Sequence, residues 1–195
     1  MTEYTLASKG VLYVISCASS AAEYVPDFVV LAQAAGWDVC VITTPQGTKF
    51  LNIPLMEQLT DHPVRSEYKH PEDLDVLPRA DAIVVFPATF NTLNKWALGI
   101  TDTLALGLLC EYTGLRMPIV TIPGIHKGSG LDTHAALARS LRLLKRHGVH
   151  ILYEPEKYPP NNKIPAESIL DTLHDVMKKH AQSKNRAEPN MPSGV

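Results

Sequence analysis

The chain has 195 residues and a formal net charge of −2 at pH 7, a length that fits one α/β domain. The lack of a basic excess argues against a nucleic acid partner, and no apolar run approaches the ~20 residues of a membrane span. Residues 2–10 are polar, so no N-terminal signal is expected. Three cysteines, Cys17, Cys40 and Cys110, show no metal-ligand spacing and indicate reduced thiols in a cytoplasmic protein.

The first predicted unit is a strand followed by a helix. Residues 11–16 form a continuous apolar run, which is typical of a strand buried on both faces. Small residues follow, and apolar positions then recur at helical spacing as far as Gly36. Ser19 and Ser20 at the start of this helix would let a phosphate approach backbone N–H groups. By itself, the turn favours a serine helix cap without a ligand.

Four further segments lead towards the middle of the chain. Residues 37–43 predict a second strand, which ends in a polar turn. Residues 54–60 predict a short helix, and residues 64–68 predict a third strand. Residues 70–79 are polar and carry prolines, so a loop is expected there.

The next predicted unit is a strand, a tight turn and a helix. The apolar run over residues 82–86 predicts a buried strand, which Pro87 ends because proline has no N–H for a strand ladder. Small and hydroxylated residues follow, and a helical pattern begins at about Leu93. Such a turn presents free backbone N–H groups and the positive end of a helix dipole. Ligands of open parallel sheets bind at the carboxyl ends of strands, so we expect a ligand site here.

The second half continues the alternation of strands and helices. Residues 96–110 are so apolar that a helix here would be buried, in the core or at a subunit interface. The remaining predicted segments are a strand at 118–123, an amphipathic helix at 131–147, a strand at 149–153, a loop at 154–165, a helix at 166–180 and a disordered tail at 181–195. The pattern predicts one α/β domain over residues 1–180, built on a doubly wound parallel sheet.

Residues 87–104 read P-A-T-F-N-T-L-N-K-W-A-L-G-I-T-D-T-L. This segment resembles the P-A-S-A-N-T motif and the G-I-x-D continuation of the homo-oligomeric flavin-containing cysteine decarboxylases. That family includes phosphopantothenoylcysteine decarboxylase and the enzymes that oxidatively decarboxylate the C-terminal cysteine of lanthipeptide-type precursors. Thr89 exchanges one hydroxyl residue for another and Phe90 departs from the motif. The matching positions are Pro87, Ala88, Asn91, Thr92, Lys95, Gly99, Ile100 and Asp102. The alternative is a generic strand–turn–helix unit in which Asn91 caps the helix.

The resemblance covers about residues 11–175 and implies a Rossmann-like or flavodoxin-like fold that binds flavin mononucleotide (FMN). It also implies a homo-oligomer, a trimer or a multiple of trimers, with residues 96–110 at the interface. The residues that would hold FMN are Ser19, Ser20, Thr44, Pro87, Thr89, Phe90, Asn91, Thr92 and Gly124.

The resemblance further implies two catalytic residues, His70 and Asn91. In the family, a histidine upstream of the motif is thought to take the proton of the substrate thiol, a role that suits a side chain exchanging protons near neutral pH. His70 is the candidate here, although it lies further from Pro87 than is usual and fits a surface-loop histidine equally well. Asn91 would hold the flavin edge and contact the substrate.

The substrate clamp of the family, P-x-M-N-x-x-M-W, is degenerate in this chain. Pro123 matches, Gly124 and Ile125 fill the middle, and His126 replaces the asparagine, but no Met-Trp pair follows. His126 or Lys127 would still hold a substrate carboxylate by charge-assisted hydrogen bonds. The alternative is a glycine-rich lid without a ligand role.

In the implied reaction, flavin oxidises a cysteine to a thioaldehyde, which is an electron sink that lets CO₂ leave and yields an enethiolate. Three functions fit this reading: decarboxylation of a C-terminal cysteine on a peptide, decarboxylation of phosphopantothenoylcysteine in coenzyme A synthesis, and FMN binding by a non-enzymatic regulatory subunit. A related flavin prenyltransferase fits less well, because its glycine-rich first turn is missing here.

The placement of cysteines favours the peptide substrate. Phosphopantothenoylcysteine decarboxylases of the family protonate their enethiolate with a cysteine in a small loop near the C-terminus. Here the corresponding residues 158–165 read Y-P-P-N-N-K-I-P, and no cysteine follows Cys110. We therefore predict a peptide-type oxidative decarboxylase, in which residues 154–165 form a mobile flap over the peptide end.

Overall fold

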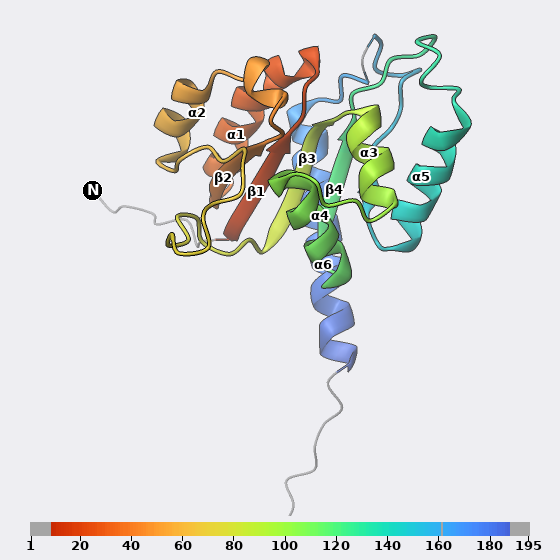
Figure 1. The fold of residues 1–195 in the computed structure, drawn as a ribbon. Helices are drawn as coiled ribbons and strands as arrows, with labels where there is room; N and C mark the ends of the chain where they lie inside the picture. The colour runs from red at the N-terminus through yellow and green to blue at the C-terminus, as the bar shows by residue number, and fades with distance from the viewer. Residues whose placement is uncertain (1–8, 161, 188–195) are drawn as a thin grey trace, which may run out of the picture.

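The computed structural model describes residues 9–160 and 162–187. Within them, five parallel strands form one sheet in the order β2-β1-β3-β4-β5 (Figure 1), which confirms the predicted doubly wound sheet. The strands are β1 (Gly10–Ser16), β2 (Trp37–Thr43), β3 (Ala82–Ala88), β4 (Ile119–Pro123) and β5 (His150–Ile151). The helices are α1 (Val25–Ala34), α2 (Ile53–Thr60), α3 (Phe90–Ala97), α4 (Leu104–Gly114), α5 (Ala135–Arg146) and α6 (Ala166–Ala187), with two 3₁₀ helices, η1 (Ser20–Tyr24) and η2 (Gly47–Lys49).

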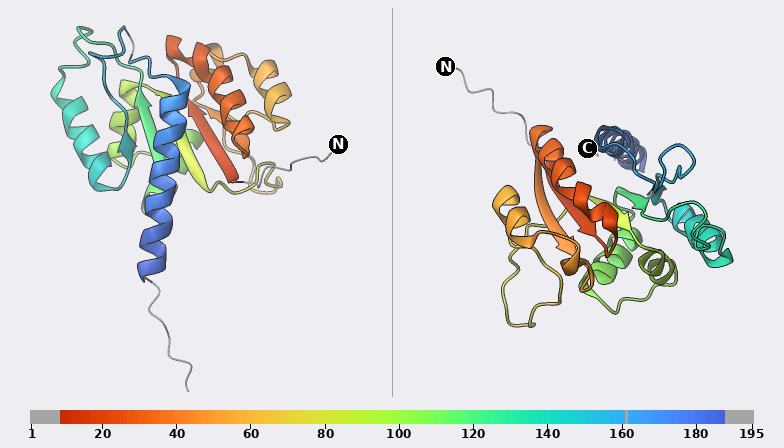
Figure 2. Two further views of the ribbon diagram at one scale, coloured as in Figure 1. Left: turned by 180° about the vertical axis from the view of Figure 1, so that it is seen from behind. Right: turned by 90° about the horizontal axis from the view of Figure 1, so that it is seen from above.

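The sheet separates two apolar clusters, and successive side chains of each central strand alternate between them. Leu12 and Val14 of β1 belong to one cluster, whereas Tyr13 and Ile15 belong to the other. Helices α1, α2 and α6 cover the first face, and α3, α4 and α5 cover the second (Figure 2). Burial on both faces explains the continuous apolar runs of these strands, since each buried aliphatic side chain stabilises the fold by ~1.5–3 kcal/mol.

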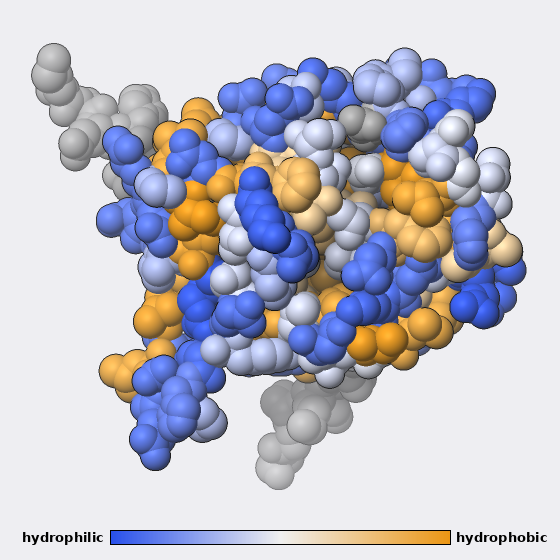
Figure 3. All heavy atoms as spheres, turned by 45° about the horizontal axis from the view of Figure 1, so that its top comes forward, coloured by the Kyte–Doolittle hydropathy of each residue, from blue (hydrophilic) through white to orange (hydrophobic). Residues whose placement is uncertain are grey.

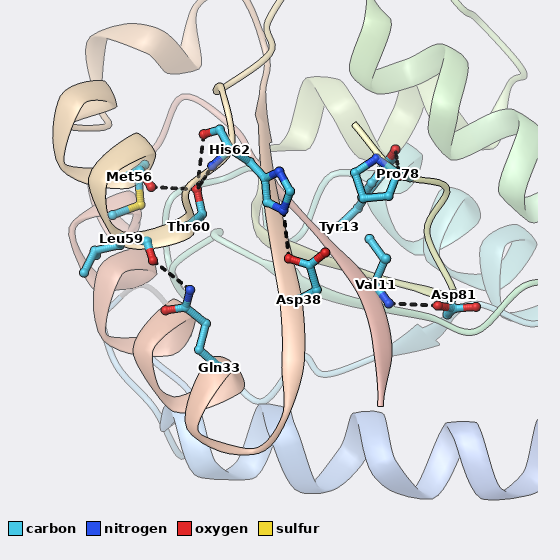
Figure 4. A network of polar contacts seen from close by, with 10 residues as sticks. All are labelled: Val11, Tyr13, Gln33, Asp38, Met56, Leu59, Thr60, His62, Pro78 and Asp81. Atoms are coloured by element: carbon cyan, nitrogen blue, oxygen red, sulfur yellow. Dashed lines mark hydrogen bonds and ion pairs between the residues drawn. The ribbon is translucent and has the colours of Figure 1, made fainter. Parts of the chain in front are cut away.

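Polar contacts fasten the long segment 62–78 to the sheet at both ends (Figure 4). At one end, His62 Nε2 lies 2.8 Å from Asp38 Oδ1 on β2. At the other end, the Tyr13 hydroxyl of β1 donates to the Pro78 carbonyl oxygen at 2.7 Å. The segment between these points contains no helix and no strand, and it includes residues 70–78 of the loop expected at 70–79.

The strand predicted over residues 64–68 is wrong. Among the described residues, a single bridge between Ile42 and Arg65 joins this segment to β2. The side chains that follow, Arg65, Ser66, Glu67 and Tyr68, are partly or fully exposed. A strand here would therefore bury no apolar row, and the sheet ends at β2.

The apolar segment 96–110 forms parts of two helices instead of one, because a turn ends α3 early. Gly99 has a positive φ of 72°, and its N–H donates to the Trp96 carbonyl at 3.0 Å. The Ile100 N–H reaches back to the Lys95 carbonyl, also at 3.0 Å. This pair of hydrogen bonds is the Schellman motif, which favours glycine at the left-handed position.

Three other helix boundaries differ from those expected. Helix α3 begins at Phe90 and not near Leu93, because Thr89 caps it. Helix α5 begins at Ala135 and not at residue 131. Helix α6 runs to Ala187, so residues 181–187 of the predicted tail are helical, and residues 188–195 lie outside the described part. None of the described helices is both long and apolar enough to cross a membrane.

Candidate functional site

The carboxyl ends of β1, β2 and β3 meet a cavity of about 470 Å³. This volume lies within the range of small-molecule sites, roughly 300–1,000 Å³. Figure 3 looks towards this edge of the molecule and shows hydrophilic and hydrophobic side chains mixed across it. The lining residues come from the turns after three strands, from α3 and from the start of α4: Ala18, Thr44, Pro45, Gln46, Thr89, Asn91, Thr92, Lys95, Thr103 and Leu106.

The turn after β3 supplies one wall, and Thr89 organises it. The Thr89 hydroxyl accepts a hydrogen bond from the Thr92 N–H at 3.3 Å, and the two threonine hydroxyl oxygens are 3.0 Å apart. This is the side-chain cap expected at a helix N-terminus. It fixes the start of α3, so that Asn91 and Lys95, which are one helical turn apart, both line the cavity.

The turn after β2 supplies the facing wall, and Gly47 makes its shape possible. The Thr44 hydroxyl accepts from the Gly47 N–H at 3.1 Å, and the Thr44 N–H donates to the Ser16 carbonyl at 3.0 Å. A Cβ atom on Gly47 would lie 2.3 Å from Thr43 Oγ1 and 2.9 Å from Thr44 Oγ1. A side chain at position 47 would therefore push Thr44 out of place.

Ser19, Pro87 and Gly124 come together beside the cavity without lining it. The Gly124 N–H donates to the Ala88 carbonyl at 2.8 Å, which brings the end of β4 against the end of β3. A Cβ atom on Gly124 would lie 3.0 Å from both Pro87 Cβ and Ser19 Oγ. Ser19 itself caps η1 by accepting from the Ala21 N–H at 3.4 Å. The resemblance placed these three residues at the flavin, and the fold places them in one cluster.

Four predicted residues stand apart from the cavity. His70 is exposed, and its N–H donates to Asp73 Oδ2 at 3.1 Å within the loop. His126 is also exposed, and Lys127 Nζ lies 2.5 Å from Glu156 Oε2. Ser20 is exposed at the start of η1.

Phe90, the residue that departs from the motif, packs away from the cavity. It is half-buried, and its ring meets the His134 ring edge-on at a centroid distance of 5.4 Å. His134 is the N-cap of α5, where its Nδ1 accepts from the Ala136 N–H at 3.1 Å. Phe90 therefore couples the starts of α3 and α5, a role for which the sequence carried no signal.

The structure adds lining residues that the motif comparison did not assign to the site. Ala18, Pro45, Gln46, Thr103 and Leu106 line the cavity. Three of them are next to predicted residues in the sequence: Ala18, Pro45 and Gln46. Their position in the turns after β1 and β2 was therefore the sequence signal that could have placed them at the site. Thr103 and Leu106 belong to the start of α4, which only the fold brings to this place.

Cys17 lies directly behind the cavity but offers no reactive thiolate. Its side chain is fully buried, and this burial raises the pKa of the Cys17 thiol, although hydrogen bonds with Thr92 and Thr89 oppose the shift. A neutral buried thiol is a poor nucleophile. Within residues 9–160 and 162–187, no group of three His, Cys, Asp or Glu side chains is placed to hold a metal ion.

A model of the flavoprotein family matches residues 2–182, and the chain belongs to this family. It is 33% identical over 100 residues to a cysteine/cysteine sulfinic acid decarboxylase of an unknown prokaryotic organism, covering 48% of this chain and 26% of the relative. It is 29% identical over 149 residues to the coenzyme A biosynthesis bifunctional protein CoaBC of Thermococcus kodakarensis, covering 74% of this chain and 36% of the relative. The chain thus spans about a quarter to a third of the length of these curated relatives.

The fold is also that of a solved flavin enzyme. The crystal structure of the FMN-dependent cysteine decarboxylase TvaF from thioviridamide biosynthesis matches with a TM-score of 0.70, covering 88% of this chain and 99% of that chain at 19% identity. At this level of identity, the likeness concerns the fold.

The residues around the cavity fit a flavin nucleotide in their chemistry. The hydroxyls of Thr44, Thr89 and Thr103 can bond to a polyhydroxylated chain or to the polar edge of a ring. The small side chain of Ala18 and the aliphatic surface of Leu106 leave space for a flat apolar ring system.

Proposed function

We propose that the chain is an FMN-dependent cysteine decarboxylase. The observation that carries the proposal is the cavity at the carboxyl ends of β1, β2 and β3, one wall of which is formed by Thr89, Asn91 and Thr92 of the P-A-T-F-N-T segment. When bound, FMN supplies the two-electron acceptor for the cysteine thiol, and the C=S group that results takes up the electron pair released when CO₂ leaves.

The residues of the chain position the reactants in this proposal. Asn91 offers an amide to the flavin edge and to the substrate, and Thr44 and Thr89 hold the cofactor through hydroxyl groups. Ser19, Pro87, Thr92 and Gly124 keep the cofactor-binding roles that the resemblance implies. Ser20 and Phe90 do not line the cavity, and their cofactor-binding roles stay predictions from the resemblance alone. His126 and Lys127 keep their proposed role at the substrate carboxylate, for which Lys127 must leave Glu156.

The substrate we propose is a C-terminal cysteine of a peptide. The loop at 154–165 contains no cysteine that could return a proton to an enethiolate, so the product leaves as the oxidised enethiol. Decarboxylation of phosphopantothenoylcysteine is the second candidate, because CoaBC of Thermococcus kodakarensis resembles 74% of this chain.

The flap assigned to this loop is anchored most firmly near its C-terminal end, at Asn162 and the buried Ile164. Asn162 is buried, with 1% of its surface exposed. Its side chain donates to the Pro123 and Leu152 carbonyls at 3.0 and 2.9 Å and accepts from the Glu154 N–H at 2.7 Å. Movement over a peptide would therefore involve the part of the loop that precedes Asn162.

We further propose a trimer, or a multiple of trimers. Leu98, Ile100 and Leu115 are large apolar residues that remain exposed at the ends of α3 and α4, as expected of an interface between subunits. In the single chain His70 does not line the cavity, so its role as base requires an assembly that brings it to a neighbouring site. Light scattering should give a multiple of three chain masses at all working concentrations; the mass of one chain would contradict the trimer.

The substrate proposal is tested by anaerobic mixing of the FMN-loaded protein with a peptide ending in cysteine and, separately, with phosphopantothenoylcysteine. We expect the peptide to bleach the flavin absorbance near ~450 nm and to lose CO₂ once per bound flavin. If phosphopantothenoylcysteine is instead turned over and the flavin returns to its oxidised state, the result would support the second candidate. Absence of reaction with either would favour a binding protein without catalysis.

A further inference from the structure

We propose that Lys95 makes the cavity bind reduced flavin in preference to oxidised flavin, and that Asp102 limits this preference. This inference rests on the proposed function, in which FMN occupies the cavity. In this proposal, an ion pair at the α3–α4 turn controls how readily the bound cofactor accepts electrons.

Lys95 is the only charged residue among those that line the cavity. The other lining side chains are hydroxyls, amides, aliphatic groups and a proline. The Lys95 side chain keeps 30% of its surface exposed, so solvent screens it less than a free surface lysine. A charge in such a partly desolvated wall acts on a bound molecule more strongly than it would in water.

Asp102 holds the Lys95 ammonium from outside the cavity. Lys95 Nζ lies 2.5 Å from Asp102 Oδ2. The Asp102 side chain is 47% exposed and does not line the cavity. The positive member of the pair therefore borders the ligand space, and the negative member stands behind it.

The turn between α3 and α4 explains why these two residues meet. The Schellman hydrogen bonds at Gly99 reverse the chain directly after α3. Asp102, seven residues after Lys95, returns along the same side of the helix end. The sequence K-W-A-L-G-I-T-D thus encodes an ion pair at a fixed place relative to the cavity.

The chemical consequence follows from charge. A flavin that takes up two electrons and one proton gains a negative charge on its ring system, whereas the oxidised ring is neutral. A cation beside the ring stabilises the reduced form selectively, which is one way a protein tunes a flavin. Lys95 then favours oxidation of the substrate thiol, and Asp102 opposes it by partly neutralising Lys95.

The test is the midpoint potential of FMN bound to the full chain, measured by anaerobic reductive titration against a reference dye. Lys95→Met should weaken the affinity for reduced relative to oxidised FMN about tenfold, which is a shift of about −30 mV for a two-electron couple. Asp102→Asn should move the potential in the positive direction, and Lys95→Arg should stay close to the wild type. Lys178→Met, on the exposed ion pair of α6, should leave the potential unchanged.

Opposite signs for Lys95→Met and Asp102→Asn separate an electrostatic role from a structural one. An ion pair that only stabilised the turn would move both variants alike or leave both potentials unchanged, and either result overturns the inference. If Lys95→Met does not retain FMN, the test depends on Asp102→Asn alone. A midpoint potential of Asp102→Asn that does not rise above that of the wild type refutes the inference. A wild-type chain that binds no FMN refutes the proposed function itself, and the inference with it.

Discussion

Replacing Asn91 by Asp is expected to weaken the binding of FMN strongly and to abolish decarboxylase activity. Asn91 is exposed to the cavity from the first turn of α3. A carboxylate at this position loses the amide donor and faces the electron-rich edge of the ring with a negative charge. Loss of a hydrogen bond at such a site costs ~1–3 kcal/mol, so the affinity for FMN should fall roughly 10- to 100-fold.

The measurement is a fluorescence titration of the flavin-free apoprotein with FMN, followed by the anaerobic assay with a cysteine peptide. Asn52→Asp is the matched control, because Asn52 caps α2 away from the cavity through a bond to the Leu55 N–H, and Asp caps a helix as well as Asn. Asn91→Ala should fall between the wild type and Asn91→Asp. Equal FMN affinity for Asn91→Asp and the wild type would remove Asn91 from the site.

Asn162→Ala should produce the largest loss of stability among single changes outside the apolar clusters. Its side chain makes three hydrogen bonds to the backbone of Glu154, Pro123 and Leu152. Truncation leaves one buried and two partly buried backbone groups without this partner. At ~1–3 kcal/mol for each unpaired buried group, the free energy of unfolding should drop by about 3 kcal/mol. For a domain of this size the melting temperature should fall by roughly 6–12 °C.

Urea denaturation followed by circular dichroism measures this loss. The control Asn52→Ala removes a helix cap and should cost only about 1 kcal/mol. A loss no larger than that of Asn52→Ala would mean that the 154–165 loop contributes little to the fold, as a freely mobile flap would.

The sequence predicted well those elements whose residue types follow directly from their burial or from a local turn. Strands β1 and β3 are buried on both faces, so their apolar runs admit no other regular element of that length. The ligand turn was readable in part: Thr89 caps a helix as its residue type indicates, but β3 continues through Pro87 to Ala88 and does not end at Pro87 as predicted. Both features depend only on neighbours along the chain.

The misjudged elements depend on contacts that are distant in sequence. Residues 64–68 resemble a strand, yet only tertiary placement decides whether their side chains find a surface to cover. Asn162 reads as one more polar loop residue, and its burial follows from the way β4 ends beneath it. Its φ of 54° is a conformation that asparagine tolerates better than most residues, but the sequence does not reveal that it is used.

The candidate site likewise contains residues that the sequence predicted and residues that only the fold places there. Thr44, Thr89, Asn91 and Thr92 were named from the sequence and line one cavity. Lys95 was visible only as a motif match, since its place at the cavity depends on where α3 begins. The proposed place of His70 at the site of a neighbouring chain depends on how two copies pack together, and the sequence of one chain does not show this packing.

The contact between Tyr68 and α4 gives the cavity a support that lies outside it. The Tyr68 hydroxyl donates to the Thr103 carbonyl at 3.1 Å, and Gly107 leaves the space for it, because a Cβ atom there would lie 2.2 Å from the hydroxyl oxygen. Thr103 in turn lines the cavity. For protein engineering, this means that substitutions at Tyr68 or Gly107 offer a way to reshape the site while every residue in contact with the ligand space keeps its identity.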